Sequence, residues 1–171
     1  YEEPWVEAVN KVLEPIMTRI MNLMDVINPK INYVKIDRWD TWSMDCTLSL
    51  IILPMLKQLR DTKHGSPFVD DDDVPEGLKS TSASPKENEW DTDDNHFKRW
   101  DWVLDEMIWA FEQKVNDESE DQFFDHSEVP EDAGLEGYKQ IKYDQEAHMV
   151  WHKRKENGFR LFGKYYEGLW D

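Results

Sequence analysis

The chain has 171 residues and a formal net charge of −17, and nearly all of that charge falls in two segments. Residues 70–94 hold ten carboxylates against two lysines, and residues 117–132 hold eight carboxylates and no Lys or Arg, so each segment contributes −8. A protein surface that imitates nucleic-acid phosphates needs its charge on folded elements rather than on solvated loops. The distribution therefore argues against nucleic-acid mimicry, and we expect no direct nucleic-acid binding.

The length predicts a single domain over residues 1–171. Nine Trp, seven Phe and six Tyr predict an aromatic core. Cys46 has no second cysteine to pair with and lies in an apolar run, so it is interpreted as a buried structural thiol. The start of the chain resembles no secretion signal, and the longest apolar run, Leu48 to Leu56, is far shorter than a membrane span. These features favour a soluble intracellular protein.

The first predicted element is a helix over residues 4–27, because apolar residues recur there at steps of three and four. Pro15 is expected to bend this helix, since proline removes a backbone donor. Residues 31–37 alternate apolar with polar and predict an extended segment, whose pairing as a strand stays open. A second helix over residues 44–60 is apolar on most sides and is expected to be the central helix.

Two acidic loops, 61–94 and 117–133, are predicted because these segments lack a sustained period and the first is rich in Gly, Pro and Ser. We expect residues 76–94 to contribute few core groups. A third helix is predicted over residues 95–116, and a fourth over 135–170 with an interruption at Asn157 and Gly158. The pattern predicts an all-α protein, a four-helix bundle-like domain with two long acidic loops.

Several runs within the helical blocks resemble uncharacterised proteins of tailed bacteriophages, including marine myoviruses. They are Trp39 to Asp45, Ile52 to Leu59, Lys63 to Pro67, Trp100 to Trp109 and Asn157 to Tyr166. The resemblance spares the acidic loops and brings no known activity or catalytic residue. It implies a phage product that acts in the host cytoplasm.

Two clusters, one of histidines and one of aspartates, are weak candidates for a metal site. His148 and His152 share one helix face, but Gln145 and Met149 stand where a Glu-x-x-His motif would have its carboxylate, so we expect no metal there. The run from Asp70 to Asp73 lacks the alternating ligands of a calcium loop and is interpreted as a solvated charge run, with weak divalent-cation binding or docking of a basic partner as alternatives. No cofactor is predicted.

Two aromatic clusters are candidate ligand-binding sites. On the third helix, Trp102, Asp105, Glu106 and Trp109 could stack on a ring and accept hydrogen bonds from it, although a helix buried on two sides would look the same. Arg38, Trp39 and Trp42 could form a cationic aromatic pocket with Lys63 and His64, suited to a phosphate-bearing ligand. The alternative is ordinary ion pairing of Arg38 while the two indoles close the core.

Two classes of function follow, and an enzyme comes third because no catalytic motif is recognisable. The first is a non-catalytic binding protein that acts on a host protein. The second is a small-ligand binder that sequesters a nucleotide or phosphate-bearing signal. Homo-oligomer contacts through the surplus aromatic residues would suit either class. We favour the first because it asks for no preformed pocket.

Overall fold

The computed structural model describes residues 13–20, 23, 34–86, 88–127, 129–130, 137 and 139–170. The chain divides into two compact units, Tyr1–Asp40 and Thr41–Asp171. In the first unit, residues 13–20 and residue 23 are helical, whereas residues 34–37 have no regular structure. The rest of the predicted helix 4–27 and residues 31–33 lie outside the described residues. The four-helix bundle and the single domain therefore stay predictions.

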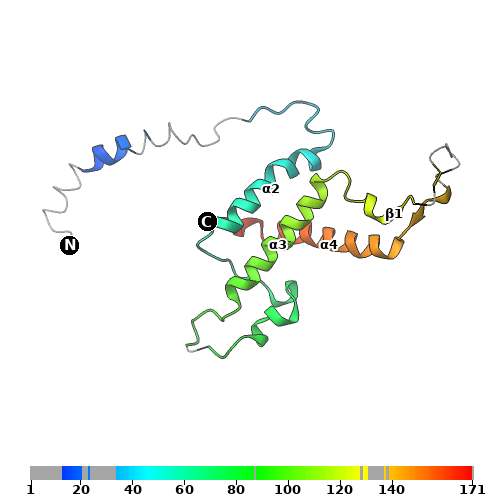
Figure 1. The fold of residues 1–171 in the computed structure, drawn as a ribbon. Coiled ribbons are helices and arrows are strands. Elements are labelled where there is room, and N and C mark those ends of the chain that lie inside the picture. Colours follow the sequence, from blue (N-terminus) through cyan, green and yellow to red (C-terminus); the bar gives the residue numbers. More distant parts are fainter. Residues whose placement is uncertain are drawn as a thin grey trace. The chain divides into compact units, whose positions relative to one another are not determined.

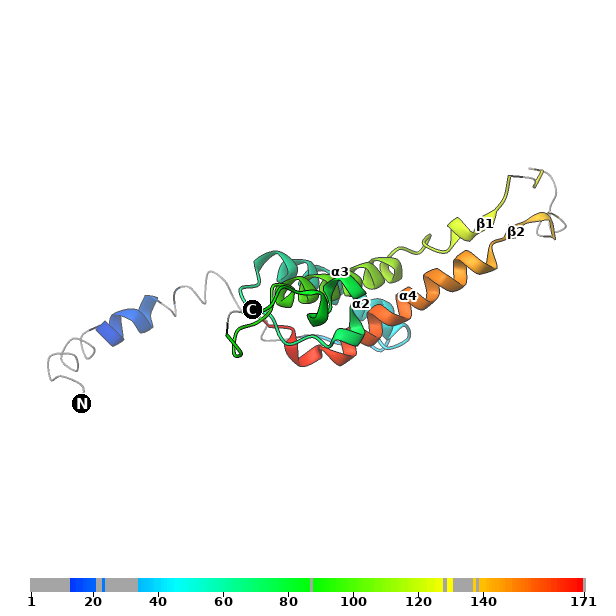
Figure 2. The same ribbon diagram turned by 90° about the horizontal axis from the view of Figure 1, so that it is seen from below.

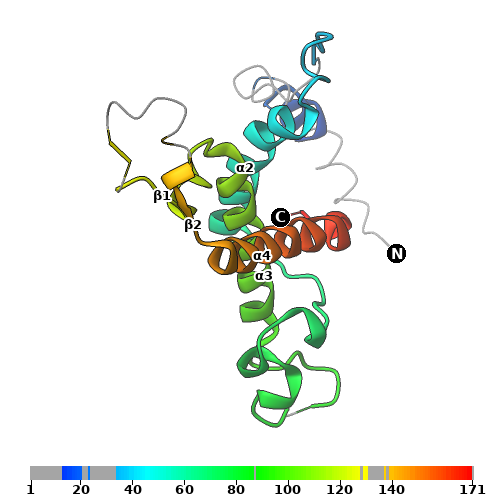
Figure 3. The same ribbon diagram turned by 90° about the vertical axis from the view of Figure 1, so that its right-hand side faces the viewer.

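The described residues are mostly helical, as predicted, and three long helices build the second unit (Figure 1). They are α2 (Met44–Thr62), α3 (His96–Val115) and α4 (Gln145–Lys164). Ion pairs at both ends of the α2–α3 contact, Asp45 with Lys114 and Lys63 with Asp101, show that these two helices run antiparallel. Helix α4 crosses α3 on another side (Figure 3).

Helix α3 is the central helix, so the prediction that residues 44–60 would be central is wrong. The buried apolar side chains of α3 make up much of the core, together with groups from α2, from the loop after it and from α4. From α3 they are Trp100, Val103, Leu104, Met107 and Phe111, and from elsewhere Leu56, Val69, Val74, Leu161 and Tyr165. Because α3 is covered by both other helices, its apolar stripe is wide, whereas α2, as far as the described residues show, keeps large apolar side chains such as Leu50, Ile51 and Met55 exposed.

The crossing of α3 and α4 depends on Gly158. A Cβ at this position would collide with Cβ of Ala110 and would lie 2.7 Å from the backbone oxygen of Glu106. Helix α4 continues through Asn157 and Gly158, so the predicted interruption there does not occur. The glycine lets two helix backbones approach closely, and its helix-weakening effect is tolerated for that reason.

Helix α4 begins at Gln145 rather than near residue 135. The residues before it form a short antiparallel ribbon in which β2 (Lys142–Tyr143) pairs with β1 (Phe124–Asp125), at the end of α4 seen in Figure 2. Asp144 then caps the helix, because its side chain accepts a hydrogen bond from the backbone N–H of Ala147 (2.9 Å). The Phe124 and Tyr143 rings stack, so pairing across the ribbon replaces the first helical turns that periodicity predicted.

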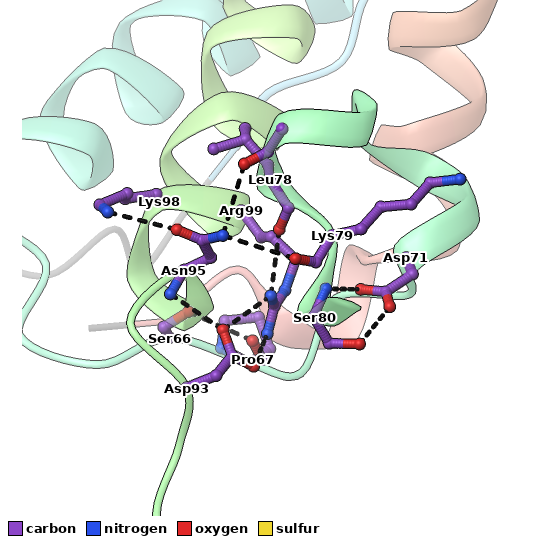
Figure 4. A network of polar contacts seen from close by, with 11 residues as sticks. Ser66, Pro67, Asp71, Leu78, Lys79, Ser80, Asp93, Asn95, Lys98 and Arg99 are labelled. Carbon is purple, nitrogen blue, oxygen red and sulfur yellow. Dashed lines mark hydrogen bonds and ion pairs between the residues drawn. The ribbon is translucent and has the colours of Figure 1, made fainter. Parts of the chain in front are cut away.

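The first acidic segment is not a simple solvated loop. It contains three short 3₁₀ turns, at Asp71–Asp73, Glu76–Leu78 and Ser80–Ser82. Arg99 of α3 donates to both carboxylate oxygens of Asp93 (2.9 and 2.7 Å) and to the carbonyl of Leu78 (3.1 Å), as Figure 4 shows. Because Arg99 and Asp93 are both buried, this pair fastens the segment to the start of α3.

The interpretation of Cys46 as a buried thiol is wrong, whereas the described part of residues 76–94 places few groups against the core. Leu78 packs against the core and Asp93 is buried, while Trp90, the one aromatic of the segment, is exposed. Cys46 is also exposed, although its side chain interacts with Lys114 of α3. Among the described residues, no helix combines the length and apolar character of a membrane span.

Candidate functional site

An apolar groove of about 580 Å³ lies between α2 and the C-terminal segment. Its walls carry no charged residue. Ile52, Met55, Leu56, Gln58, Leu59 and Thr62 line it from α2, and Phe162, Tyr166, Leu169 and Trp170 line it from the end of the chain. Met55 is 61% exposed and Tyr166 is 65% exposed, so the groove is open to solvent along its length.

The exposed apolar stripe of α2 continues from the groove. Met44, Leu48, Ile51 and Met55 recur at helical spacing and are all exposed, although each is a large apolar side chain. Single exposed apolar residues are common on soluble proteins, but a contiguous patch marks an interaction surface. Sequence reasoning noticed that α2 is apolar on most sides and interpreted this as burial, so it missed Met55, Tyr166 and Trp170 as site residues.

The C-terminal wall of the groove is held in place by the first acidic segment. The Asp73 carboxylate accepts hydrogen bonds from Lys164 and from the Tyr165 hydroxyl (both 2.5 Å) and pairs with Arg160 (2.7 Å). The Tyr165 oxygen in turn accepts from the backbone N–H of Asp70 (3.0 Å). These contacts lie at the end of α4, directly before the residues that line the groove.

Hydrogen bonding decides the ionisation of this cluster. Burial would raise the pKa of the Asp73 carboxyl, but hydrogen bonds from Lys164, Tyr165 and Arg160 outweigh burial and hold the pKa below its usual value. Burial, with the hydrogen bond to Asp73, raises the pKa of Tyr165 to about 12. Asp73 is therefore a charged structural anchor, and the Asp70 to Asp73 run is not the solvated charge run predicted from the sequence.

A close contact between Gly168 and Pro67 also holds the C-terminal wall of the groove in place. A Cβ on Gly168 would lie 3.0 Å from Cγ of Pro67, so the C-terminal 3₁₀ turn (Tyr166–Gly168) packs tightly on the loop after α2. A side chain at this position would push the turn away from the loop. Both walls of the groove thus rest on contacts within the second unit.

The candidate residues of α3 all contact neighbouring helices or the core. Asp105 accepts a hydrogen bond from Arg60 of α2 (2.8 Å), and buried Glu106 pairs with Arg154 of α4 (2.7 Å). The Arg154 guanidinium also lies 4.0 Å from the Trp109 ring centroid, and Trp102 packs against the core. These contacts match the interpretation of α3 as a helix buried on two sides.

The second candidate cluster is divided between the two units. Arg38 lies over the ring of Trp39, 4.4 Å from its centroid, in the first unit. Trp42, Lys63 and His64 belong to the second unit, where Lys63 pairs with Asp101 (2.5 Å) and Trp42 is largely exposed. A pocket formed by all five residues stays a prediction.

His148 and His152 lie on one face of α4, with ring centroids 6.2 Å apart. The His148 ring shares a hydrogen bond with the Tyr143 hydroxyl (2.5 Å) and stacks on Trp151, and His152 pairs with Glu156 (3.6 Å). Within the described ranges, no cluster of three or more His, Cys, Asp or Glu has the arrangement of a metal site. His148 thus fastens the β1–β2 ribbon to α4.

Comparison of the chain with protein-family models, curated proteins and solved structures finds no match. The fold and the groove are therefore the observations on which a function can be argued.

Proposed function

We propose that this chain is a non-catalytic binding protein whose groove between α2 and the C-terminal segment holds a partner protein. The observation that carries the proposal is the exposure of large apolar side chains along the groove and along α2. Exposing such a surface to water is unfavourable by roughly 25 cal/mol per Å² of apolar area, and a partner that covers it recovers that free energy. The resemblance to phage proteins supports a phage-encoded protein and a host protein as the partner, in the bacterial cytoplasm.

The nucleotide-binding alternative has less support from the contacts. Nucleotide recognition needs charged or polar groups that converge on an open cavity. Lys63, Asp105 and Glu106, which would provide them, already pair with Asp101, Arg60 and Arg154. Among the described lining residues, the polar side-chain groups are those of Gln58 and Thr62, the Tyr166 hydroxyl and the Trp170 indole N–H. An apolar groove with few polar groups suits a protein surface better than a phosphate-bearing ligand.

Native mass spectrometry of the protein purified from its bacterial host tests this function. We expect a host protein to be retained by the wild type and by Leu50→Asp, and lost in Met55→Asp. Leu50 and Met55 are both about 60% exposed on α2, but only Met55 lines the groove, so the pair separates loss of the groove from damage to the helix. Retention of a mass of a few hundred daltons without a protein would support the small-ligand class instead.

A further inference from the structure

The helix of the first unit leaves its apolar side chains in contact with water. Residues 13–20 and residue 23, drawn in blue in Figure 1, are helical, and all of them are exposed. Its five large apolar side chains are each between 46% and 61% exposed: Leu13, Ile16, Met17, Ile20 and Leu23. Among the described residues of the first unit none is buried, so the described part of this unit gives the helix no apolar cover of its own.

The spacing of these side chains is that of a coiled-coil seam. Apolar residues follow one another at alternating steps of three and four, which are the a and d positions of a heptad repeat. In the sequence these steps continue without a break at Val6, Val9, Leu13, Ile16, Ile20, Leu23 and Ile27. The apolar seam therefore keeps one register over three heptads, and the described helix holds its central part.

Polar residues of the same segment lie outside this seam. Glu14 and Thr18 take the b and f positions, and the Thr18 hydroxyl donates a hydrogen bond to the backbone oxygen of Glu14 within the helix (2.8 Å). Pro15 takes the c position, and the described helix runs through it. Because the proline ring and the missing N–H lie away from the a and d positions, they do not interrupt the seam.

A second copy of the same helix matches the seam in shape and in charge. Two identical helices in register place a against a and d against d, so that side chains of one helix fill the spaces of the other. Residues 4–27 hold three acidic and two basic residues, a net charge of −1, whereas residues 70–94 and 117–132 carry −8 each of the total −17. The seam segments of two copies therefore meet with little repulsion, despite the charge of the whole chain.

The apolar area is also of the size that such an interface takes. The five described side chains, each about half exposed, supply roughly half of the about 800 Å² that each partner contributes to a stable interface. The seam positions that continue the pattern in the sequence on either side supply further apolar groups.

We infer that the helix of the first unit joins this chain to a second copy of itself through the a and d seam. Leu and Ile occur at both positions, a mixture that suits two strands or three. This inference goes beyond the proposed function and uses another helix than the groove does. Self-association through the first unit places two or more copies of the groove in one assembly.

Analytical ultracentrifugation of the full chain over a range of concentrations tests the inference. We expect the wild type to be a dimer or trimer, and Ile20→Asp to raise its dissociation constant about hundredfold, because the seam then buries a charge. Thr18→Asp adds the same charge to the same helix outside the seam and should change the dissociation constant less than about threefold. A wild type that is monomeric at every concentration would overturn the inference, as would equal dissociation by the two variants.

Disulfide crosslinking gives a second measurement that does not depend on a disruptive charge. In a Cys46→Ser background, Ile20→Cys places the thiols of two copies at facing a positions, where oxidised glutathione should join them in an intermolecular disulfide. Thr18→Cys carries its thiol on the outer side of the helix and should stay largely unlinked. Equal linking of the two variants would show random collision in place of a seam and would overturn the inference.

The same variants separate this inference from the proposed function. Met55→Asp should leave the association state unchanged, and Ile20→Asp should still retain a host protein in native mass spectrometry, because the seam and the groove belong to different helices. If Met55→Asp dissociates the oligomer and Ile20→Asp does not, a second copy occupies the groove, and both proposals are overturned. If Ile20→Asp yields monomers but the wild type retains no host protein, the seam is supported and the proposed function fails.

Discussion

Gly158 is a residue at which α3 and α4 approach each other closely, and its role can be tested directly. Gly158→Ala should lower the free energy of unfolding by about 1–3 kcal/mol, because the new Cβ has no space between Ala110 and the Glu106 backbone. Urea unfolding of the purified protein measures the change.

Gly163 is the matched control for this substitution, since it lies in the same helix and a Cβ there would meet nothing within 4 Å. Gly163→Ala should be neutral or stabilising by up to about 1 kcal/mol, as expected when a helical glycine gains a side chain. If both variants lose the same stability, close helix contact is not the reason for glycine at 158.

Asp73 is the residue that ties the groove wall to the acidic segment, and its effect depends on pH. Its folded-state pKa lies below the ordinary value of 3.8, so the stability it adds is present above that value and is lost as the pH falls through the folded pKa. Asp73→Asn should cost about 1.5–3 kcal/mol at pH 7, because Lys164, Arg160 and Tyr165 lose a charged acceptor.

Urea unfolding of wild type and Asp73→Asn at pH 7 and at successive values below pH 4 checks this pH dependence. The difference between the two proteins should shrink as the pH drops, since protonation of Asp73 in the wild type then mimics the substitution. Asp72→Asn is the control, because Asp72 is exposed and should show little effect at either pH. A difference that stays constant from pH 7 to pH 2 would contradict the role given to the Asp73 charge.

At the scale of elements, the first acidic segment behaves as part of the fold because α3 holds it. Arg99→Gln should destabilise the protein by about 3–5 kcal/mol, since it leaves the buried Asp93 carboxylate without its cation. Limited proteolysis should then cut residues 76–92 sooner than in the wild type.

Lys98→Gln is the control at the neighbouring position of α3, where the cation is exposed and bonds only the Asn95 side chain among the contacts described (3.2 Å). It should change neither the unfolding free energy nor the rate of cleavage. Unchanged proteolysis of Arg99→Gln would show that the segment is held by its apolar contacts, such as that of Leu78, and not by the ion pair.

At the scale of the whole molecule, calorimetry with a panel of nucleotides separates the two function classes. We expect no binding to the wild type, because the charged groups that would receive a phosphate-bearing ligand in the second unit are paired within it. Binding that Arg38→Ala abolishes, with an unchanged melting temperature, would favour the small-ligand class and contradict the protein-binding proposal.

Local patterns in the sequence were sufficient to predict the bounds of the long helices α2 and α3. The predicted ranges 44–60 and 95–116 lie within two residues of Met44–Thr62 and His96–Val115, because helical periodicity is a property of neighbouring residues. Helix α4 was predicted to start too early, since Lys142 and Tyr143 pair with Phe124 and Asp125 across the ribbon. Such pairing depends on a segment that is distant in the sequence.

The amino-acid sequence by itself determined the mostly helical class, the segregation of charge and the apolar character of α2 and α3. Only the tertiary structure decided which of these helices is covered on two sides, that Asp73 and Asp93 are anchors, and that Gly158 serves a helix crossing. The physical reason is that a periodic apolar stripe shows that a face avoids water but not what covers it. Among the described residues, one such face of α2 stays exposed beside the groove.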